Sequence, residues 1–417
     1  MKKTVWILNH YATDHFYEMG GRHFWISDQL KKKGYDPVVF GASDLHNDER
    51  QINLKKKFKC MKTTINVPLV VVRVRSERTG GIHRVLNMID YYRNVQVAAN
   101  YYGKKYGKPD VIYASSVHPL TLIAGEKLAK KYKVPCVCEV RDLWPETMVL
   151  MNIWKKNSLV TKAMYVGEKW IYKNADALVF TMEGGKEYIK SRRWDESSGG
   201  PIKLSQVYHV NNGVDLKRFK ENIEKYTLED QDLLEKDKFI VNYTGSIRRA
   251  NNVAELVETA KYLKSYNDKI KILIWGAGDF VESLCKLIDE SGLDNIKYKG
   301  VIKKIYVPSV LVQGDINIYT FRDGGTKYGI DLNKCFEYLA SGKPAIGNDE
   351  TMFSVIRKYG CGIEEKMDAK ELANAINDIA TLPEDEYLKL CRSASEASKD
   401  YDFSVLTDKL IDIIESL

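Results

Sequence analysis

The stretch Phe321–Asn348, FRDGGTKYGIDLNKCFEYLASGKPAIGN, decides which fold and which chemistry the sequence predicts. It begins as a Gly-rich polar loop and continues as an amphipathic helix of about three turns centred on Phe336. The helix stops at Gly342-Lys343-Pro344, before the apolar pair Ala345-Ile346. The stretch therefore predicts a loop, a helix and a strand, in that order.

A helix that starts behind a Gly-containing loop presents free backbone N–H groups and the positive end of its dipole, and this combination binds phosphate. Lys334, in the first turn, would add a full positive charge. Glu337 lies one turn deeper on the same face, where its carboxylate can accept hydrogen bonds from a ribose diol. The pattern favours a nucleotide-sugar site, but loops and helices of this kind often only pack, so the rest of the chain has to decide.

The length and composition of the chain are those of a two-domain globular protein. Its 417 residues suggest two domains of roughly 200 residues each, with a cleft between them. No apolar run approaches the roughly 18 residues of a membrane-spanning helix. We read Met1–Asn9 as the first strand, because its apolar run is too short for a signal peptide, and we expect the seven cysteines to be reduced.

The net charge of +8 is carried mainly by the N-terminal half. Its lysines gather at 31–33, 55–57, 104–105 and 130–131, and each cluster by itself is typical of a solvated helix face. Together they favour an anionic surface as a partner. Nucleic acid is disfavoured as a partner, because the sequence has no zinc-finger spacing, no ribonucleoprotein aromatic motif and no long basic helix.

Short apolar runs alternate with helix-length segments along the chain, as strands and helices do in a doubly wound parallel sheet. We therefore expect an α/β fold with two Rossmann-like domains, 1–215 and 216–400. A C-terminal helix, 401–417, follows, and a crossing back to the first domain is one option for it. The polar stretches 197–200 and 217–238 are the expected hinge. The expected strands are 5–8, 37–40, 70–74, 111–114, 134–140, 177–181, 239–243, 271–275, 296–298, 316–319 and 345–346.

Polar residues follow the N-terminal strands, at the edge where parallel sheets bind ligands. After the first strand, Gly20 and Gly21 open a helix at which a substrate can approach the backbone, and Arg22 can meet a phosphate. His118 follows the fourth strand and precedes Pro119. It can hydrogen-bond a sugar hydroxyl or serve only as a satisfied polar group at the helix start.

Two further stretches follow the fifth strand. Residues 139–146 read EVRDLWPE, and so many charges directly after a buried strand indicate that Arg141 and Asp142 face a ligand or each other. Residues 148–172 are rich in Met, Trp and Lys, as an interfacial membrane helix would be. An ordinary helix packed on the sheet is the alternative for this stretch.

Two more glycine loops end strands in the C-terminal half. The first, 244–252, reads TGSIRRANN and places two arginines before a helix, where they can clamp a diphosphate. The second, 276–279, reads GAGD and lacks the third glycine of a dinucleotide fingerprint. The segment 300–308 is a candidate frame for a nucleobase. The donor-side residues expected in the two loops are Gly245, Ser246, Arg248, Arg249, Gly276 and Gly278.

In their order along the chain, these motifs resemble those of the group 1 glycosyltransferases, family 4. The resemblance spans nearly the whole chain and rests on NNGVD with Phe219, the two glycine loops, the segment 298–319 and FEYLASGKPAI. EVRDLWPE and NKCFEY are similar to the bacterial branch that makes O-antigen and capsule repeat units. The resemblance implies a retaining GT-B enzyme with two Rossmann-like domains across a cleft, no cofactor, and a UDP- or GDP-type sugar as co-substrate.

The resemblance also implies roles for individual residues. Gly20 and Gly21 match the paired glycines of the acceptor and donor phosphate side, His118 matches the first-domain histidine, and Glu337 matches the glutamate that holds the ribose. The full assignment is catalytic for His118, Arg248 and Lys334; donor-binding for Gly20, Gly21, Gly245, Ser246, Arg249, Gly276, Gly278, Asp331, Asn333 and Glu337; and acceptor-side for Arg22, Arg141 and Asp142.

The sequence departs from the family eight residues before Glu337. There the family usually has another glutamate, which touches the donor sugar. Gly329 stands there, and Asp331 and Asp323 are the carboxylates that could replace it.

The phosphate loop also departs, because Ser246 stands for an arginine and Asn251 for a lysine. The counter-charge is then expected from Arg248, Arg249 or Lys334. Since no Asp-x-Asp motif occurs in the right loop, we expect catalysis without a metal.

These inferences predict a hexosyl- or N-acetylhexosaminyl-type glycosyltransferase. It is expected in the cytoplasm, peripheral at the inner face of the membrane, with a lipid-linked or saccharide acceptor. Two alternatives stay open. One is a GT-B enzyme with a soluble acceptor, such as a sucrose-phosphate or glycogen type synthase. The other is a nucleotide-sugar-binding protein without turnover, suggested by the missing glutamate.

Overall fold

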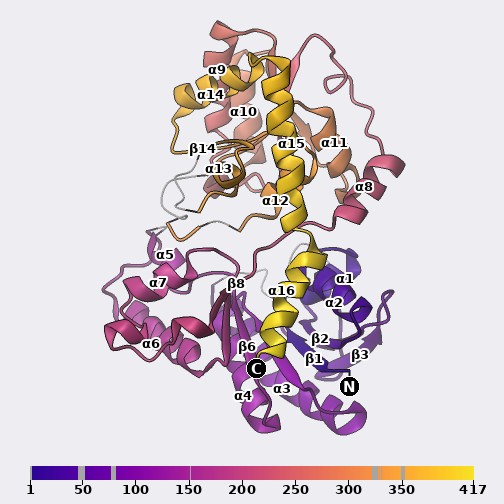
Figure 1. Cartoon of the computed structure of the whole chain (residues 1–417), viewed down its shortest axis with the longest axis vertical. Helices are drawn as coiled ribbons and strands as arrows, with labels where there is room; N and C mark the ends of the chain where they lie inside the picture. Colours follow the sequence, from indigo (N-terminus) through magenta and orange to yellow (C-terminus); the bar gives the residue numbers. More distant parts are fainter. Residues whose placement is uncertain are drawn as a thin grey trace. The chain divides into compact units, whose positions relative to one another are not determined.

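Two units of similar architecture make up the chain (Figure 1). The computed structural model describes residues 2–45, 52–76, 81–150, 152–321, 327–329, 331–348 and 353–417. Unit 1 comprises 1–211 and 403–417, and unit 2 comprises 212–402. The sequence analysis placed the boundaries after residues 215 and 400. It also placed the hinge at 197–200 and 217–238, but the first stretch lies inside unit 1 and the second inside unit 2.

The sheet of unit 1 has eight strands in the part that the structure describes, in the order β3-β4-β2-β1-β5-β6-β7-β8. Neighbouring strands are parallel except for β3, which pairs antiparallel with β4 at the edge. The strands are β1 (Thr4–Leu8), β2 (Asp36–Ala42), β3 (Phe58–Lys62), β4 (Pro68–Val72), β5 (Val111–Ser115), β6 (Cys136–Val140), β7 (Ala177–Phe180) and β8 (Val207–His209). The helices are α1 (Ala12–Tyr17), α2 (Arg22–Lys32), α3 (Gly81–Tyr106), α4 (Pro119–Tyr132), α5 (Glu146–Leu150), α6 (Leu159–Asn174), α7 (Gly185–Ser191) and α16 (Phe403–Glu415).

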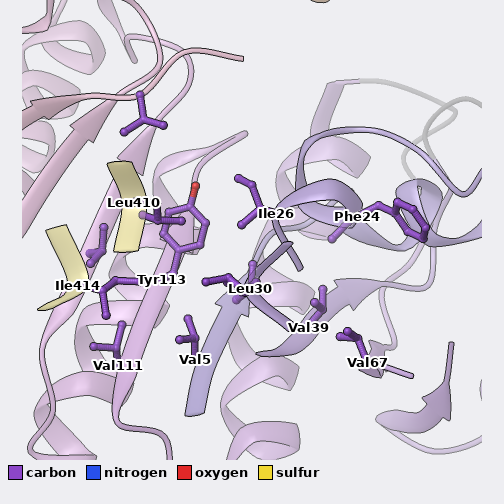
Figure 2. Packing of buried hydrophobic residues seen from close by; sticks show 14 of the residues in the cluster. Val5, Phe24, Ile26, Leu30, Val39, Val67, Val111, Tyr113, Leu410 and Ile414 are labelled. Atoms are coloured by element: carbon purple, nitrogen blue, oxygen red, sulfur yellow. The ribbon is translucent and has the colours of Figure 1, made fainter. Parts of the chain in front are cut away.

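Successive side chains of each strand point to opposite faces, and both faces of this sheet are buried. Val5 of β1 packs in the core formed with α1, α2 and α16, whereas Trp6 packs against aromatic rings of α3 and α4. Figure 2 shows Leu410 and Ile414 of α16 beside Tyr113 and other core residues. The C-terminal helix therefore supplies part of the core of unit 1.

Two strands of unit 1 were not predicted. β3 reads FKCMK, so lysines interrupt its apolar residues, and its side chains are exposed or half-buried. Lysines on an edge strand oppose pairing with another chain, and this explains why an edge strand carries so little apolar signal. β8 has three residues, which is too short for a pattern.

The sheet of unit 2 is parallel throughout its described part, with the strand order β11-β10-β9-β12-β13-β14. Helices α9, α10 and α14 pack on one face, and α11, α12 and α15 contribute to the clusters on the other. The short strand β14 was not predicted. The strands are β9 (Phe239–Thr244), β10 (Ile270–Trp275), β11 (Ile296–Gly300), β12 (Ile316–Tyr319), β13 (Ala345–Gly347) and β14 (Gly362–Glu364). The helices are α8 (Leu216–Lys225), α9 (Glu255–Tyr266), α10 (Val281–Ser291), α11 (Val307–Gln313), α12 (Asn333–Ala340), α13 (Val355–Tyr359), α14 (Ala369–Ala380) and α15 (Glu384–Asp400).

A buried carboxylate holds the charged stretch 217–238 to the sheet of unit 2. Asp232 is 6% exposed, and its oxygens accept from Lys271 of β10 at 2.5 Å, from Lys297 of β11 at 2.6 Å and from Lys299. Burial by itself raises the pKa of the Asp232 carboxyl, but the hydrogen bonds from the three lysines outweigh it and hold the pKa well below its usual value. The stretch is therefore packed structure.

We expect Asp232→Asn to lower the free energy of unfolding by about 2–3 kcal/mol at neutral pH, because the buried ammonium of Lys271 then keeps only one carboxylate partner, Glu235 at 2.7 Å. Since the pKa of Asp232 is lower in the folded than in the unfolded state, its contribution is complete above about pH 4 and is lost as the pH falls further. Urea unfolding of both proteins at several pH values should show the difference shrinking in acid. A difference that stays constant would contradict this account.

Candidate functional site

The helix α12 stands at the carboxyl edge of the unit 2 sheet, as the sequence predicted, and Tyr338 fixes it there. The buried Tyr338 hydroxyl donates to the carbonyl of Ile318 at 3.0 Å and accepts from the N–H of Thr244 at 3.2 Å. The residue before the helix, Leu332, has no side chain that caps the first turn. Tyr338 therefore ties α12 to the carboxyl ends of β9 and β12.

The glycines of the two loops allow the loops to pack on each other. Gly245 and Gly276 have φ values of +142° and +146°. A methyl group on Gly276 would lie 1.8 Å from the carbonyl oxygen of Gly245, and one on Gly278 would lie 2.0 Å from that of Ile247. The N–H of Gly245 donates to Trp275 and that of Gly276 to Gly300. These glycines shape the loops, and the N–H groups of Gly245 and Gly276 are bonded within the protein.

Lys334 reaches from α12 to the loop. Its Nζ lies 3.1 Å from the hydroxyl of Tyr243 and 4.4 Å from the centre of that ring. A methyl group on Gly245 would lie 3.2 Å from the same Nζ. Burial lowers the pKa of Lys334 to about 7, with the Glu337 carboxylate opposing that change. The amine of Lys334 thus lies at the loop after β9, as the sequence predicted, and it loses its proton more readily than an ordinary lysine.

The other residues predicted on α12 have different surroundings. Glu337 is half-buried, and burial raises its pKa to about 7 against the charges of Lys304 and Lys334. Asn333 is exposed at the first position of the helix. One carboxylate oxygen of Asp331 accepts the N–H of Asn212 at 2.7 Å. Asp331 therefore fastens the start of unit 2.

The side chains of Ser246, Arg248 and Arg249 are exposed on the loop after β9. The loop carbonyl of Ser246 accepts from Tyr243 at 2.7 Å. Three cations were offered by the sequence as counter-charge. Among the described residues, Lys334 is the one of these three whose side chain lies against Gly245.

In unit 1, Gly20 and Gly21 precede α2. At one of these two positions, Gly21, a larger residue would clash with its neighbours. Gly21 has a φ of +90°, and a methyl group there would lie 2.6 Å from the ring of His15. His15 in turn stacks on His23 of α2, with ring planes 8° apart. Gly20 has open space around it, since only a backbone oxygen lies within 4 Å of such a methyl group.

Arg22, which the sequence predicted to meet a phosphate, is enclosed within unit 1. The residue is 3% exposed, and its Nε and Nη2 donate to Glu139 of β6 at 2.9 and 2.5 Å. Its Nη groups also donate to the carbonyls of Val210 and Asn211, the last residues of unit 1 before the chain enters unit 2. A side chain that is enclosed in this way has a structural role, and its acceptor-side assignment stays a prediction.

Glu139 completes this buried cluster. It accepts from Ser115 at 2.6 Å and from Tyr113, both on β5. Burial by itself raises the pKa of the Glu139 carboxyl, but Arg22 outweighs burial and keeps it below its usual value. The carboxylate is thus ionised and fully paired inside the edge of the sheet.

His118 lies at the start of α4, as predicted, and is enclosed. It is 1% exposed, and its Nε2 lies 2.9 Å from Nδ1 of His10. Burial, together with the charge of Arg84, lowers the pKa of His118 to about 3, so its ring is neutral. Its Nδ1 has no hydrogen-bond partner among the residues that the structure describes.

Arg141 and Asp142 follow β6. The N–H of Arg141 donates to the hydroxyl of Ser116 at 3.0 Å, and its Nε is buried without a partner in the described ranges. Asp142 is exposed. Arg141 and Asp142 remain acceptor-side candidates of unit 1, and His118, from the neighbouring strand end, remains a catalytic candidate.

Two family models match the chain, one for each unit. Residues 212–400 match the model described as "Glycosyl transferases group 1", and residues 25–197 match "Glycosyl transferase 4-like domain". The chain is a group 1 glycosyltransferase. No curated protein sequence matches it.

Solved structures show that this glycosyltransferase has the GT-B fold. Sucrose-phosphate synthase from Thermosynechococcus elongatus is 18% identical with a TM-score of 0.70, over 100% of this chain and 99% of that one. Anabaena HepE in complex with UDP and glucose is 14% identical with a TM-score of 0.66, over 100% of both chains. The α,α-trehalose 6-phosphate synthase of Burkholderia multivorans is 14% identical with a TM-score of 0.71, over 100% and 99%.

The glycosyltransferase departs from its family at Gly329, and the backbone gives a physical reason. Gly329 has a φ of +98°, a conformation that residues with a side chain rarely adopt. A glutamate at this position would be strained, so the departure involves the backbone as well as the side chain. Asp323, one of its proposed replacements, lies outside the described residues.

Sequence reasoning missed Tyr243 and His10 as parts of this glycosyltransferase's candidate site. Tyr243 is buried on β9 and looks like a core residue in an apolar run. His10 follows β1 and meets His118 across the ends of β1 and β5. The available signal was a position at or next to the carboxyl end of a strand.

We expect Arg22→Met to destabilise unit 1 by about 3–5 kcal/mol, because it leaves the Glu139 carboxylate buried without its guanidinium. Thermal and urea unfolding measure the loss. The double variant Arg22→Met/Glu139→Gln should recover part of it, since a neutral amide costs less to bury. Arg218→Met is the matched control, because that exposed arginine lies 3.8 Å from Glu221 and should change stability little. Unchanged stability together with lost substrate affinity would restore Arg22 as a ligand.

Proposed function

We propose that this glycosyltransferase moves a hexosyl or N-acetylhexosaminyl group from a UDP- or GDP-type sugar to a lipid-linked acceptor. The transfer retains configuration and serves bacterial surface polysaccharide synthesis of the O-antigen or capsule kind. The observation that carries the donor part is the pair Lys334 and Glu337 on α12, one turn apart at the carboxyl edge of the unit 2 sheet. Anabaena HepE, which shares the fold, has been solved with UDP-glucose, and this supports a UDP-type donor.

On the donor side, the leaving diphosphate lies against the N-terminus of α12 and the Lys334 ammonium. Both stabilise the negative charge that grows as the bond to the sugar breaks. Glu337 accepts hydrogen bonds from the ribose diol. His118 is the catalytic candidate of unit 1, and Arg248 and Arg249 are outer cations of the loop after β9. With these charges in place, the reaction proceeds without a metal.

The acceptor part of the proposal rests on α6. One face of this helix is buried through Thr161, Tyr165 and Glu168, and the opposite face carries an exposed apolar stripe. The stripe consists of Leu159 (85% exposed), Val160 (64%), Val166 (70%) and Trp170 (47%). None of the helices in the described ranges is both long and apolar enough to cross a membrane.

Lysines surround this stripe. Lys155 and Lys156 precede the helix, and Lys162 and Lys173 flank its apolar face, all of them exposed. Apolar side chains ringed by lysines on a helix surface suit the boundary of an anionic bilayer. The lysines at 31–33 are different, since they lie in ion pairs with Asp36, Asp28 and Asp408. The lysines on and next to α6 are therefore better candidates for binding an anionic membrane than the lysines at 31–33.

The donor proposal predicts that a UDP- or GDP-sugar raises the melting temperature in the presence of EDTA, because a ligand of the folded state stabilises it. Transfer or slow hydrolysis of that sugar should also survive EDTA. Glu337→Ala should weaken nucleotide binding by about 1–3 kcal/mol, the cost of losing hydrogen bonds to a charged group. Thermal shift and calorimetric titration measure both effects.

Glu282→Ala, an exposed carboxylate on α10, is the matched control and should bind like the wild type. Turnover that EDTA abolishes and Mg²⁺ or Mn²⁺ restores would overturn the metal-free reaction. Binding without any transfer or hydrolysis would favour the non-catalytic alternative.

The acceptor proposal predicts peripheral, salt-sensitive membrane binding. In co-sedimentation, the protein should pellet with phosphatidylglycerol vesicles at low salt and be released at high salt, since each lysine near the surface contributes roughly 1 kcal/mol that salt screens. Lys155→Glu/Lys156→Glu should weaken binding. Leu159→Ser/Val166→Ser should also weaken it, through lost apolar burial.

The matched control is Lys55→Glu/Lys56→Glu, which changes the net charge equally next to β3, at the opposite edge of the sheet from β7 and β8. Equal weakening by both charge reversals would mean that overall charge, and not α6, binds the vesicles. A protein that stays in the supernatant at every salt concentration would favour a soluble acceptor. Sucrose-phosphate synthase and trehalose 6-phosphate synthase, named above for their fold, make that the leading alternative.

A further inference from the structure

The loop after β9 carries no cation next to its glycine. Ser246 follows Gly245 directly and is exposed, and Arg248 and Arg249 point their exposed side chains from positions further along. Asn251 is tied into the fold, since its carbonyl accepts from Thr320 at 2.6 Å. The positive charge at Gly245 comes from Lys334, on another element of unit 2.

Tyr243 holds this lysine. The tyrosine is 0% exposed, and its hydroxyl donates to the carbonyl of Ser246 at 2.7 Å. Because that hydrogen is used, the oxygen lone pairs are left to accept from Lys334 Nζ at 3.1 Å. The ring adds a cation–π contact at 4.4 Å. One residue thus fixes the loop carbonyl and the ammonium at the same time.

We propose that Tyr243 is a positioning residue that holds the Lys334 amine at Gly245 as the cation for the donor's diphosphate. The inference rests on the proposed function and deepens it, because it assigns the diphosphate, rather than the sugar or the base, to this point. Tyr243 itself contacts the lysine and the loop, and it acts on the ligand through them.

The charge of this lysine depends on few neighbours. On its own helix, Glu337 opposes the loss of the proton, and Lys304 acts on Glu337 in turn. From β9, the neutral Tyr243 hydroxyl accepts from the amine. Among the described residues, no carboxylate pairs directly with this ammonium. Burial lowers its pKa to about 7, so it loses its proton near neutral pH, and a bound diphosphate would raise the pKa again.

The test compares UDP with UMP, and GDP with GMP, by calorimetric titration from about pH 7 to about pH 9, where both phosphates are fully ionised. The ratio of the diphosphate affinity to the monophosphate affinity isolates the second phosphate. Both probes contain the same ribose, so the contact of the ribose with Glu337 cancels in this ratio. In the wild type this preference should fall as the pH rises, because Lys334 loses its charge. In Tyr243→Phe it should be about threefold to tenfold smaller at pH 7, and its fall should move to lower pH.

Two lysine variants and one tyrosine control complete the design. Lys334→Gln should show a small preference for the diphosphate that does not change with pH. Lys334→Arg should also show a preference that does not change with pH, since arginine keeps its charge. Tyr387→Phe is the matched control, because it removes a hydroxyl that donates to the carbonyl of Asp315 at 2.7 Å, away from the loop. It should keep the wild-type pH profile. Melting temperatures verify that every variant is folded.

A Tyr243→Phe variant with the wild-type preference and profile would overturn the inference and leave the proposed function intact. If Tyr243→Phe does not fold, the Lys334 variants decide, and a wild-type preference in Lys334→Gln would overturn it equally. No binding of UDP or GDP to the wild type would overturn the proposed function, and the inference with it.

Discussion

The buried ion pair between Arg22 and Glu139 is the interaction on which the carboxyl edge of unit 1 depends. Both side chains are almost fully enclosed, at 1% and 0% exposure. Removing two charges from water costs several kcal/mol for each ion, so the pair depends on the further hydrogen bonds that both side chains make. Arg22 reaches two backbone carbonyls, and Glu139 takes two hydroxyls. The start of α2, the ends of β5 and β6, and the exit to unit 2 are therefore fixed as one piece.

Lys334, at the carboxyl edge of the unit 2 sheet, differs from Arg22 in that no carboxylate pairs with it directly among the described residues. The charge of Arg22 is neutralised by the Glu139 carboxylate, so it stabilises the fold. Lys334 is matched by a tyrosine hydroxyl and an aromatic ring, which orient an ammonium but do not neutralise it. A charge that is positioned but not neutralised is what an anionic ligand requires. This difference in partner, and not the residue type, is why we propose Lys334, and not Arg22, as a ligand-binding cation.

Much of the fold could be predicted because apolar runs report directly on buried strands. The expected strand 316–319 is β12, and the expected strand 111–114 differs from β5 by one residue. The strands β3, β8 and β14 were missed, because lysines interrupt the first and the other two have three residues each. Periodicity carries no signal in such short or edge segments.

The candidate site could be predicted only where its residues are neighbours in sequence. Lys334 and Glu337 lie on one helix, so their spacing alone placed them together. Arg22 and Glu139 are 117 residues apart, and nothing local tells whether an arginine at a helix start faces a ligand or a distant carboxylate. The same limit hid Tyr243, since its hydroxyl meets Lys334 across 91 residues of chain.

The departures of this glycosyltransferase from its family fit together as one redistribution of charge. The phosphate loop has a serine and an asparagine where the family has an arginine and a lysine, and α12 carries Lys334 at the same loop. An arginine stays charged at every physiological pH, so it would attract any anion whether or not the donor is present. A partly buried lysine whose pKa is lowered to about 7 is charged fully only when an anion stabilises it. In the proposed site, Lys334 therefore adds a charge that the bound diphosphate completes to the permanent charges of Arg248 and Arg249 on the loop.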